Sequence, residues 1–483
     1  MRIGVTQRIL GLLLMLFSTS MLPPIAVSFI FSDGSYPAFL AGFAVTLAAG
    51  AVIWFPVRED KRELRLRDGF LVVAAFWLVL GSFGAAPLLF SEQPSMDLTD
   101  AVFEAISGLT TTGATVLTGL DDLPPAILYY RQQLQWLGGM GIIVLAVAVL
   151  PMLGVGGMQL YRAEAPGPVK DSKLTPRITE TAKALWYIYL SLTIACGLAY
   201  FAAGMPAFDA LCHAFSTVAI GGFSTHDASI GHFSSTGIDL VAVLFMFLAG
   251  INFSLHFVAW RNTSVRHYWQ EPEFRAYCAV LGGLLAFVLV RLYFQGVFSS
   301  APETLVTGLF QTVSIATTTG FTTTNFAAWP GALPVVLLFS SFIGGCAGST
   351  AGGMKVIRVL LLYKQGVREV QRLVHPSAEM PVKLGRMAVP SRVVEAVWGF
   401  FAVYVVLFAI MMTVLLATGL DQVTAFSAIA ASLNNLGPGL GDVATGFGSL
   451  NDVAKWVCVL AMLLGRLEIF TLLVLVSRTF WRP

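Results

Sequence analysis

The chain has 483 residues, of which 56% are apolar and only 12% are charged. So few charged side chains cannot cover the surface of a water-soluble protein of this length, so the composition predicts that most of the surface faces lipid. The net charge is +2, with 29 basic and 27 acidic side chains. This near balance gives no reason to expect nucleic acid as a partner.

Ten apolar stretches are long enough to cross a bilayer, which takes about 20 helical residues. They lie at residues 9–31, 38–57, 69–90, 132–153, 184–204, 236–260, 276–295, 332–362, 393–418 and 453–477. The first stretch follows two arginines, as a signal peptide would, but it runs through Pro23 and Pro24 without a small-residue cleavage pattern. We therefore expect an all-α polytopic membrane protein that keeps its first helix.

Basic residues divide the connecting segments into two sets. Of the 29 Lys and Arg residues, 25 fall in residues 1–8, 58–68, 161–183, 261–275, 355–392 and 478–483. Because cytoplasmic loops hold an excess of Lys and Arg, these segments, and with them both termini, are predicted to be cytoplasmic. The opposite loops carry acidic residues instead. Those acids either concentrate cations at an entrance or reflect nothing beyond the exclusion of bases from that side.

Four segments between successive spans resemble one another. They read DAVFEAISGLTTTGAT at 100–115, DALCHAFSTVAIGGFST at 209–225, TLVTGLFQTVSIATTTGFTT at 304–323 and TAFSAIAASLNNLGPGLG at 424–441. Each predicts a short helix that is followed by small or polar residues and a glycine, and these glycines are 109, 98 and 117 residues apart. The chain is therefore predicted to repeat one unit four times, made of a membrane helix, a half helix, a loop and a second membrane helix.

Acidic residues open the four half helices, at Asp100, Asp209, Glu303 and Asp421. An acid at a helix N-terminus caps the helix and favours its dipole, so we expect the negative C-terminal ends to meet at the glycines. Four such ends around one axis would attract a cation.

An ion filter requires successive backbone carbonyls that replace the hydration shell, in dihedral angles open mainly to glycine. The candidate filter residues are Thr111, Thr112 and Gly113; Ile220, Gly221 and Gly222; Thr318, Thr319 and Gly320; and Asn435, Leu436 and Gly437. The alternative is that these small residues only allow helices to pack closely, but packing does not require a half helix first.

Seven motifs carry a resemblance to a known family. They are SGLTTTGAT at 107–115, QWLGGMGIIVLAVAVLP at 135–151, GVGGMQLYRAE at 154–164, IGGFSTHDASIG at 220–231, FIGGCAGSTAGGMKVIR at 342–358, NNLGPGLG at 434–441 and GRLEIFTLLVL at 465–475. In these motifs the chain resembles the membrane subunit of the bacterial Trk potassium uptake system, of the TrkH and TrkG type, within the Trk, Ktr and HKT superfamily. The resemblance covers essentially the whole chain.

The resemblance implies a pseudo-fourfold pore in the bacterial inner membrane, with potassium held by backbone carbonyls at the four glycines. On this interpretation residues 1–60 form two extra helices, and the repeats occupy 61–160, 161–262, 263–372 and 373–483. It also implies a membrane homodimer and a cytosolic TrkA-type regulatory subunit that binds NAD and adenine nucleotides. The four filters differ, reading TTGA, GGFS, TTGF and LGPG. A sodium-permeable or proton-coupled transporter of the same superfamily therefore stays open as an alternative.

A glycine-rich stretch in the third repeat predicts an intramembrane loop over residues 344–354. Five glycines in ten residues cannot hold a stable helix interior, at about 1 kcal/mol for each glycine. The resemblance makes this loop a gate beneath the filter, whereas a glycine-packed helix crossing is the alternative. Its candidate gating residues are Gly344, Gly345, Gly348, Ser349, Thr350, Gly352 and Gly353.

Two further features lie below the filter. A glycine recurs 25 to 28 residues after each filter glycine, at Gly139, Gly250, Gly345 and Gly465, where each second helix needs room. Next to the last of them, Arg466 lies inside the final span, where a charge costs at least about 2.5 kcal/mol and should face water or a partner. We predict that Arg466 acts as an electrostatic gate. The alternative is a structural ion pair with Glu468 or Glu104.

Two other classes of protein fit the sequence less well. A secondary transporter predicts inverted or paired repeats with carboxylates at mid-membrane, and a membrane enzyme requires a convergent acid, base or metal constellation. The five cysteines and six histidines, His226 and His232 among them, show no ligand spacing, and there is no nucleotide-binding motif. We therefore predict no enzymatic activity and no cofactor, with K⁺ as the transported ion.

Overall fold

The computed structural model describes residues 3–60, 66–139, 141, 178–385 and 387–481. Its regular structure in these ranges is helical, apart from a two-residue antiparallel pairing of β1 (Lys383–Leu384) with β2 (Met387–Ala388). Six helical stretches are long and apolar enough to span a membrane, namely Ile3–Phe31, Tyr36–Val57, Asp68–Phe90, Lys183–Ala202, Pro272–Phe294 and Ser391–Ala417. Each corresponds to a span that the sequence predicts, so the all-helical, multi-span class is confirmed.

Two predicted spans are sharply bent rather than straight. Residues 236–260 form α12 (Thr236–Ala249) and α13 (Phe253–Arg261), which meet at 92°. Residues 453–477 form α21 (Asp452–Arg466) and α22 (Phe470–Val476), which meet at 110°. Hydropathy alone does not report such bends, because the residues on both sides are apolar.

Two other predicted spans are not continuous helices over the residues that the structure describes. Residues 332–362 contain α17 (Leu333–Ser340) and α18 (Val356–Val374), separated by a non-helical stretch. The predicted span 132–153 starts within α7 (Pro125–Gly139), and its residues from 142 onward lie outside the described ones. The whole motif at 154–164 also lies outside them.

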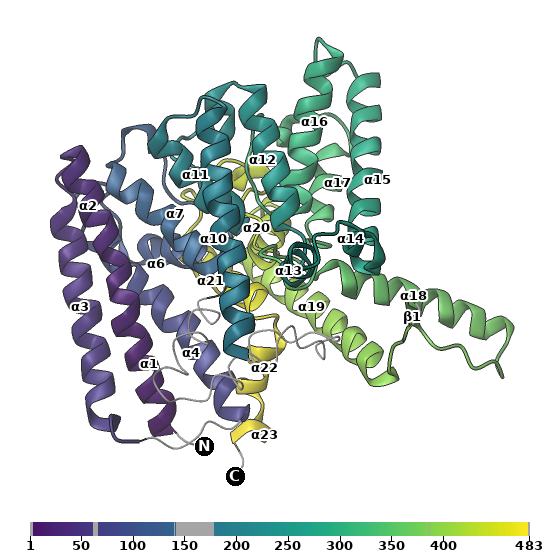
Figure 1. Ribbon diagram of the computed structural model, residues 1–483, viewed down its shortest axis with the longest axis horizontal. Coiled ribbons are helices and arrows are strands. Elements are labelled where there is room, and N and C mark those ends of the chain that lie inside the picture. Colours follow the sequence, from purple (N-terminus) through teal and green to yellow (C-terminus); the bar gives the residue numbers. More distant parts are fainter. Residues whose placement is uncertain (1–2, 61–65, 140, 142–177, 386, 482–483) are drawn as a thin grey trace.

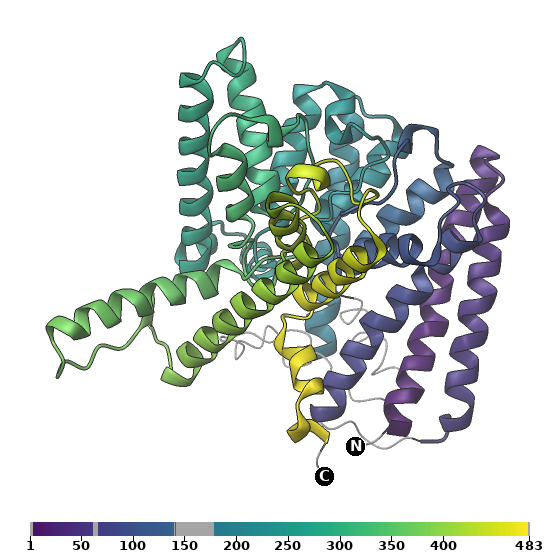
Figure 2. The ribbon, with the colours of Figure 1, turned by 180° about the vertical axis from the view of Figure 1, so that it is seen from behind.

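The N-terminal helices form a layer at one side of the molecule (Figures 1 and 2). Here α1 (Ile3–Ser18) packs along α3 (Tyr36–Trp54) and also contacts α4 (Leu66–Gly84). Glycines allow the close approach, since a methyl group on Gly11 would lie 2.8 Å from the carbonyl oxygen of Gly50. The remaining short elements of this layer are η1 (Thr19–Met21), α2 (Leu22–Phe31), η2 (Phe55–Val57) and α5 (Ala86–Phe90).

Four short helices lie inside the molecule, and each packs between a preceding and a following helix. They are α6 (Leu98–Leu109), α11 (Ala207–Ala219), α16 (Ala301–Ala316) and α20 (Gln422–Leu433). The preceding helices are α4, α10 (Ile178–Ala202), α15 (Pro272–Phe294) and α19 (Ser391–Ala417), and the following ones are α7, α12, α17 and α21.

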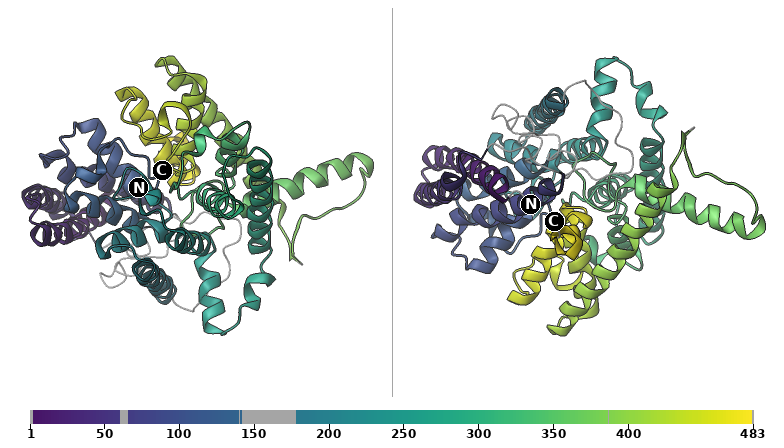
Figure 3. Two further views of the ribbon diagram at one scale, coloured as in Figure 1. Left: turned by 90° about the horizontal axis from the view of Figure 1, so that it is seen from above. Right: turned by 90° about the horizontal axis from the view of Figure 1, so that it is seen from below.

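Contacts between these groups close on themselves. Each following helix also packs against the short helix of the next group: α7 contacts α11, α12 contacts α16, α17 contacts α20, and α21 returns to α6. Viewed from above, the groups follow one another around the centre in chain order (Figure 3). The C-terminal ends of the short helices are thereby brought to one place.

The starts of the short helices differ in part from the prediction. Only Asp421 is an N-cap, whereas Asp100, Asp209 and Glu303 lie within the first turn. The N-cap of α6 is Asp97, whose carboxylate accepts a hydrogen bond from the backbone N–H of Asp100 at 2.8 Å. All four acids still lie at the positive end of a helix dipole, where a negative charge is favoured.

One amphipathic element leaves the body of the molecule. The helix α18 and the short hairpin after it extend outward (Figures 1 and 2), with exposed apolar side chains at Tyr363, Val370 and Leu373. The other short elements are η3 (Leu120–Asp122), η5 (Ser229–Phe233), α14 (Arg266–Gln270), η6 (Phe326–Ala328), η7 (Gly441–Val443) and α23 (Arg478–Trp481).

Candidate functional site

Where each short helix ends, the chain continues into a buried four-residue stretch that we call a glycine segment. The segments are residues 110–113, 219–222, 317–320 and 434–437. The second residue of each has a left-handed backbone, with φ of 55° at Thr111, 55° at Ile220, 67° at Thr318 and 53° at Asn435. The final glycine again has a positive φ, of 78° at Gly113, 78° at Gly222, 83° at Gly320 and 97° at Gly437. The residue between them has no positive φ, so all four segments share one alternating backbone.

The same hydrogen bond fixes this backbone four times. The residue before the glycine donates its N–H to the carbonyl five residues earlier, at 2.8 Å in every segment: Thr112 to Ser107, Gly221 to Ser216, Thr319 to Ser314 and Leu436 to Ala431. This bond closes the helix end in the manner of a Schellman motif. A left-handed residue other than glycine costs about 1–3 kcal/mol and persists only where the surroundings enforce it.

The glycines are required because each touches the next segment. A methyl group on Gly113 would lie 2.0 Å from the carbonyl oxygen of Gly221, and one on Gly222 would lie 2.1 Å from that of Thr319. The same contact recurs from Gly320 to Leu436 at 2.1 Å and from Gly437 back to Thr112 at 2.8 Å. No side chain fits at these four positions. The contacts therefore form a closed ring of backbone.

Side chains support the ring from outside. Asn435 donates to the hydroxyl of Thr112 at 2.9 Å and to the carbonyl of Met462 at 3.0 Å, which joins the last segment to the first. Gln135 of α7 donates to the Gly221 carbonyl at 2.5 Å and accepts from the N–H of Phe223 at 3.1 Å. Sequence reasoning missed Gln135, although a polar side chain within an apolar span is a signal of this kind of role.

A buried ion pair holds the first two groups together above the ring. Arg131 donates to Glu104 at 2.7 Å, and both side chains are at most 1% exposed. The carboxylate also accepts from the hydroxyl of Thr115 at 2.9 Å, while the guanidinium donates to the carbonyl of Ser224 at 3.2 Å. With its charges paired and hydrogen-bonded, Glu104 has a structural role, because breaking one partner would leave a buried charge.

Between α17 and α18 the chain forms a non-helical loop over residues 341–355, which we call the crossing loop. It contacts the inner ends of three short helices. Thr350 donates to the carbonyl of Val218 at 2.9 Å, and the N–H of Gly352 donates to the hydroxyl of Thr318 at 2.7 Å. The N–H of Gly353 donates to the carbonyl of Asn434 at 3.0 Å. The loop therefore lies directly against the glycine segments.

Arg466 joins the crossing loop to the first glycine segment and to the end of α7. Its guanidinium donates to the hydroxyl of Thr111 at 3.2 Å, to the carbonyl of Thr350 at 3.3 Å and to the carbonyls of Gly138 and Gly139. All four of these acceptors are neutral oxygens. The two carboxylates considered from the sequence pair with other arginines, Glu104 with Arg131 and Glu468 with Arg358.

One carboxylate ties the middle of the crossing loop to the start of α18. Glu273, in the first turn of α15, accepts from the N–H of Ala347 at 2.7 Å and from the N–H of Ile357 at 3.1 Å. Its side chain is buried, with the residue 6% exposed. The sequence analysis missed Glu273, because its partners are more than 70 residues away.

The structure brings all twelve predicted filter residues into the ring, but it divides the predicted gating residues. Gly352 and Gly353 meet the glycine segments, and Thr350 bonds to the carbonyl of Val218 in α11, one residue before the second segment. Gly348 instead packs against the side chain of Asn252, and Ser349 bonds within the loop to the carbonyl of Cys346. The other two, Gly344 and Gly345, pack against Gly352, Ala351 and Gly250.

The four recurring glycines predicted below the filter lie where the second helices end or break. A methyl group on Gly465 would lie 2.1 Å from the Leu433 carbonyl, and one on Gly250 would lie 2.4 Å from the Tyr277 hydroxyl. In the first group the tightest position is the neighbouring Gly138, where a methyl group would lie 1.8 Å from the carbonyl oxygen of Leu109. The predicted need for room there is therefore explained by close contacts, with a carbonyl at a short helix end for Gly465 and Gly138 and with a tyrosine hydroxyl for Gly250.

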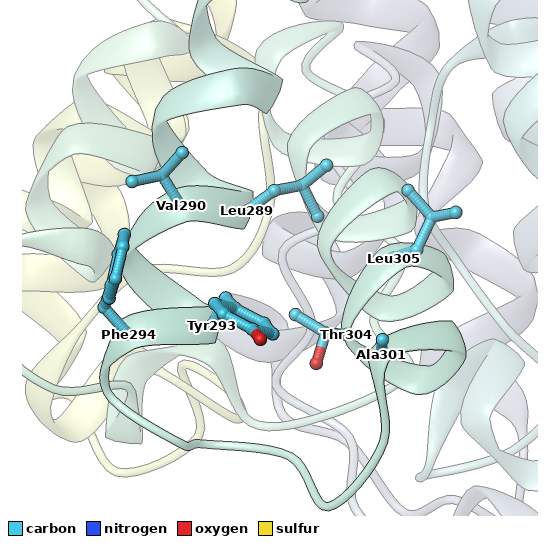
Figure 4. Close-up of a pocket in the computed structure, with 7 residues that line it drawn as sticks. All are labelled: Leu289, Val290, Tyr293, Phe294, Ala301, Thr304 and Leu305. Carbon is cyan, nitrogen blue, oxygen red and sulfur yellow. The ribbon is translucent and has the colours of Figure 1, made fainter.

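The one surface hollow that Figure 4 displays lies between α15 and α16 and is nearly all apolar. Its lining residues are Leu289, Val290, Tyr293, Phe294, Ala301, Thr304 and Leu305. None of these belongs to a glycine segment or to the crossing loop, so the hollow lies outside the polar centre.

This arrangement defines a class of protein. The buried polar centre of a multi-span helical protein consists here of backbone carbonyls, hydroxyls and amides, which suits the passage of a solute and not the transformation of one. The protein is a membrane transport protein.

The sequence matches the family described as "TrkH: Cation transport protein" over residues 35–482, and the chain belongs to this family. It is 60% identical over 479 residues to the Trk system potassium uptake protein TrkH of Vibrio parahaemolyticus, with 98% of each chain covered. It is 41% identical over 480 residues to the Trk system potassium uptake protein TrkG of Escherichia coli, with 99% of each covered. The crystal structure of the potassium transporter TrkH from V. parahaemolyticus superposes with a TM-score of 0.91, at 57% identity over 100% of both chains.

Proposed function

We propose that this protein takes up potassium through a single pore, formed by four non-identical repeats of one helix, short helix and helix unit, and that the four glycine segments are its selectivity filter. The observation that carries the proposal is the closed ring, in which each glycine approaches the carbonyl of the next segment. The printed names of its relatives, which are potassium uptake proteins, support the same ion.

The chemistry of the ring suits a weakly hydrated monovalent cation. Such filters hold the ion with neutral carbonyl oxygens, whose dipoles replace the hydration shell without trapping the ion as carboxylates would. Each short helix also directs its negative end toward the ring. The potassium-binding residues in this proposal are the twelve residues predicted from the sequence, from Thr111 to Gly113 and at the equivalent positions of the other segments.

The crossing loop and Arg466 form the gate in this proposal. The loop touches three short helix ends, and Arg466 ties it to the first segment through Thr111 and Thr350. A positive charge at this level raises the barrier for a cation. Opening requires the loop to leave the glycine segments and the guanidinium to move with it or to be screened.

The orientation is proposed from charge and from the shape of the fold. Both termini lie at the same end of the molecule (Figure 1), and the basic segments that adjoin them are expected in the cytoplasm. We propose that the protein lies in the bacterial inner membrane with both termini cytoplasmic, and that the short helices begin on the outer side.

The proposed assembly is a membrane homodimer with a cytosolic TrkA-type nucleotide-binding regulatory subunit. The relatives are named as parts of a Trk system, which supports more than one component. No nucleotide fingerprint occurs in this chain, so nucleotide control would have to come from such a partner.

The test is rubidium-86 uptake into proteoliposomes that contain the purified chain, with potassium or sodium as competitor, for the native protein, Gly113→Ser and Gly119→Ser. Both glycines have a positive φ, 78° and 70°, but only Gly113 has a carbonyl in the way, because a methyl group on Gly119 would meet nothing within 4 Å. We expect uptake that potassium blocks, loss of uptake in Gly113→Ser, and retention of it in Gly119→Ser.

Other outcomes would contradict the proposal in distinct ways. An equal loss of rubidium-86 uptake in both variants would show that left-handed backbone strain alone explains the effect. The close approach of Gly113 to the next carbonyl would then no longer support a filter. Equal competition by sodium and potassium would favour the sodium-permeable alternative. Absence of flux under any gradient, with the regulatory subunit added, would refute the pore.

A further inference from the structure

Two histidines that show no ligand spacing in the sequence are brought together by the fold. His226 follows the second glycine segment by four residues, and His232 lies in η5. Their rings stack with centroids 3.5 Å apart and an angle of 2° between the planes. Beside them is Asp121 of η3, in the loop that follows the first glycine segment. Spacing along the chain did not reveal this pair, because the fold and not the sequence order brings the two rings and Asp121 together.

The three side chains direct their polar atoms at one point. The Nδ1 of His226 lies 2.5 Å from Oδ1 of Asp121, and the Nδ1 of His232 lies 3.9 Å from the same oxygen. One nitrogen or oxygen of each lies within 4.8 Å of the others, and no other group of His, Cys, Asp or Glu among the described residues does so. The site is open to solvent on one side, since the side chains of Asp121 and His232 are 46% and 44% exposed.

The second ring nitrogen of His226, Nε2, faces the carboxylate of Asp209. This nitrogen is buried without a hydrogen-bond partner at normal distance, and the nearest acceptor is Oδ1 of Asp209 at 3.6 Å. Asp209 is itself held by the hydroxyl of Thr225 at 2.7 Å. A histidine that binds a metal through one nitrogen usually directs the other at a carboxylate, which fixes the ring and raises its basicity.

We propose that Asp121, His226 and His232 form a binding site for a divalent transition metal ion, with Zn²⁺ as the reference ion and Asp209 as the residue that orients His226. Two imidazoles and one carboxylate are a donor set for Zn²⁺, Ni²⁺ or Cu²⁺, whereas Mg²⁺, Ca²⁺ and K⁺ prefer oxygen alone. Water would complete a four-coordinate shell on the exposed side.

The required rearrangement is small. Metal–nitrogen bonds of about 2.0–2.1 Å in a tetrahedral site place the donor atoms roughly 3.3 Å apart. The distance of 2.5 Å from Asp121 to His226 must therefore lengthen and the distance of 3.9 Å to His232 must shorten. The two rings must also tilt out of their parallel stack so that both Nδ1 lone pairs reach one ion.

The position of the site gives it a consequence for transport, which rests on the proposed function. Asp227, next to His226, already accepts from the N–H groups of Gly119 at 3.1 Å and Leu120 at 2.9 Å, so the loops after the first two glycine segments are joined here. A bound divalent ion would cross-link the same loops and place positive charge near the entrance. Both effects oppose the passage of a monovalent cation.

Binding is tested first and independently of transport. The purified full-length chain, freed of metal with a chelator, is titrated with Zn²⁺ by calorimetry and with Co²⁺ by its visible absorption, for the native protein, His232→Gln, Asp121→Asn and His375→Gln. His375 is an exposed histidine outside the cluster and serves as the matched control. We expect one ion per chain, at least tenfold weaker binding in the first two variants, and native binding in His375→Gln.

Zinc that binds equally well to His232→Gln and Asp121→Asn, or no binding at all to the native chain, would overturn the site. Rubidium-86 uptake with and without Zn²⁺ then separates the two proposals. Inhibition that a chelator reverses, and that His232→Gln loses, supports the site as placed. Absence of uptake in metal-free protein that still binds zinc at this site counts against the proposed function alone.

Discussion

The ring of glycine segments repeats one backbone geometry four times, whereas the helices beneath it break with different geometries. In the ring, four stretches with different sequences have the same alternation of positive φ, the same 2.8 Å hydrogen bond and the same approach to the next carbonyl. Beneath it the second helices break in different ways: α12 and α13 meet at 92°, α21 and α22 meet at 110°, and α17 and α18 are separated by the crossing loop.

The difference teaches which part of the site needs symmetry. An ion that is coordinated by four strands of backbone requires equivalent dihedral angles from each, so side chains are free to vary while the backbone is not. A gate needs one element able to move, and equivalence there would serve no purpose. In the proposed function, the crossing loop of the third group is that element.

The largest expected effect comes from breaking the ring. Gly222→Ala and Gly320→Ala should each reduce rubidium-86 uptake by at least about tenfold, because the new methyl group would lie 2.1 Å from a backbone carbonyl that cannot move without distorting the next segment. At Gly437 the corresponding distance is 2.8 Å, so Gly437→Ala should cost less, roughly threefold. Uptake in proteoliposomes measures this order, and an equal loss at all three positions would refute the graded contact.

The next effect should come from Arg466→Gln beneath the ring. Removal of the charge that contacts Thr111 and Thr350 should raise basal uptake without a regulatory subunit by roughly tenfold, since two unit charges roughly 8–16 Å apart interact by ~1–2 kcal/mol at an effective dielectric of about 20. The control is Lys455→Gln on the same helix. Lys455 lies near the start of α21, at the opposite end from Arg466, and its ammonium pairs with Asp100 at 2.6 Å. Unchanged or lower basal uptake in Arg466→Gln would contradict the electrostatic gate.

A smaller effect is expected at the anchor of the crossing loop. Glu273→Ala removes the acceptor of the Ala347 and Ile357 N–H groups, so the loop should loosen and basal uptake should rise about twofold to threefold. Hydrogen exchange in residues 344–357 should quicken in parallel. The neighbouring exposed Glu271 provides the control, because its side chain does not cap α15. A loop as protected as in the native protein would show that Glu273 does not position it.

The smallest effect distinguishes a true N-cap from an acid in the first turn. Ser300 accepts from the N–H of Glu303 at 3.3 Å and caps α16, so Ser300→Ala should lower stability by about 1 kcal/mol. Glu303→Ala removes a favourable interaction with the dipole and an exposed hydrogen bond from the Ser299 hydroxyl at 3.2 Å, and should cost less. The thermal unfolding midpoints of the two purified variants test this order, which would be reversed if Glu303 opened the helix as the sequence suggested.

Much of the fold could be predicted because its signals are local. A short helix that ends in Thr-Thr-Gly or Leu-Gly is readable from its own residues, and so is the inability of residues 344–353 to stay helical. The bends after Ala249 and Arg466 were not predicted, since each pair of helices together is apolar enough to be a single straight span. The N-cap of α6 was misplaced by three residues, because Asp97 and Asp100 are both reasonable caps until the backbone is known.

Long-range chemistry was hidden for a different reason. Nothing near Arg466 in the sequence indicates that its partners are Thr111, Gly138 and Thr350, which lie 355, 328 and 116 residues away. Likewise His226 and His232 are six residues apart and lie outside any α-helix, and only the approach of Asp121 from another loop makes them a group.

The sequence by itself determined that this chain is a helical protein with several membrane spans, and it predicted four related units that each turn at a glycine, because hydropathy, helix propensity and backbone freedom belong to individual residues and their neighbours. The tertiary structure decided that the four turns meet in a ring, which carbonyl each glycine touches, and which helix breaks to pass beneath it. These outcomes depend on contacts between residues about a hundred or more positions apart, and such contacts are set by how whole helices pack against one another.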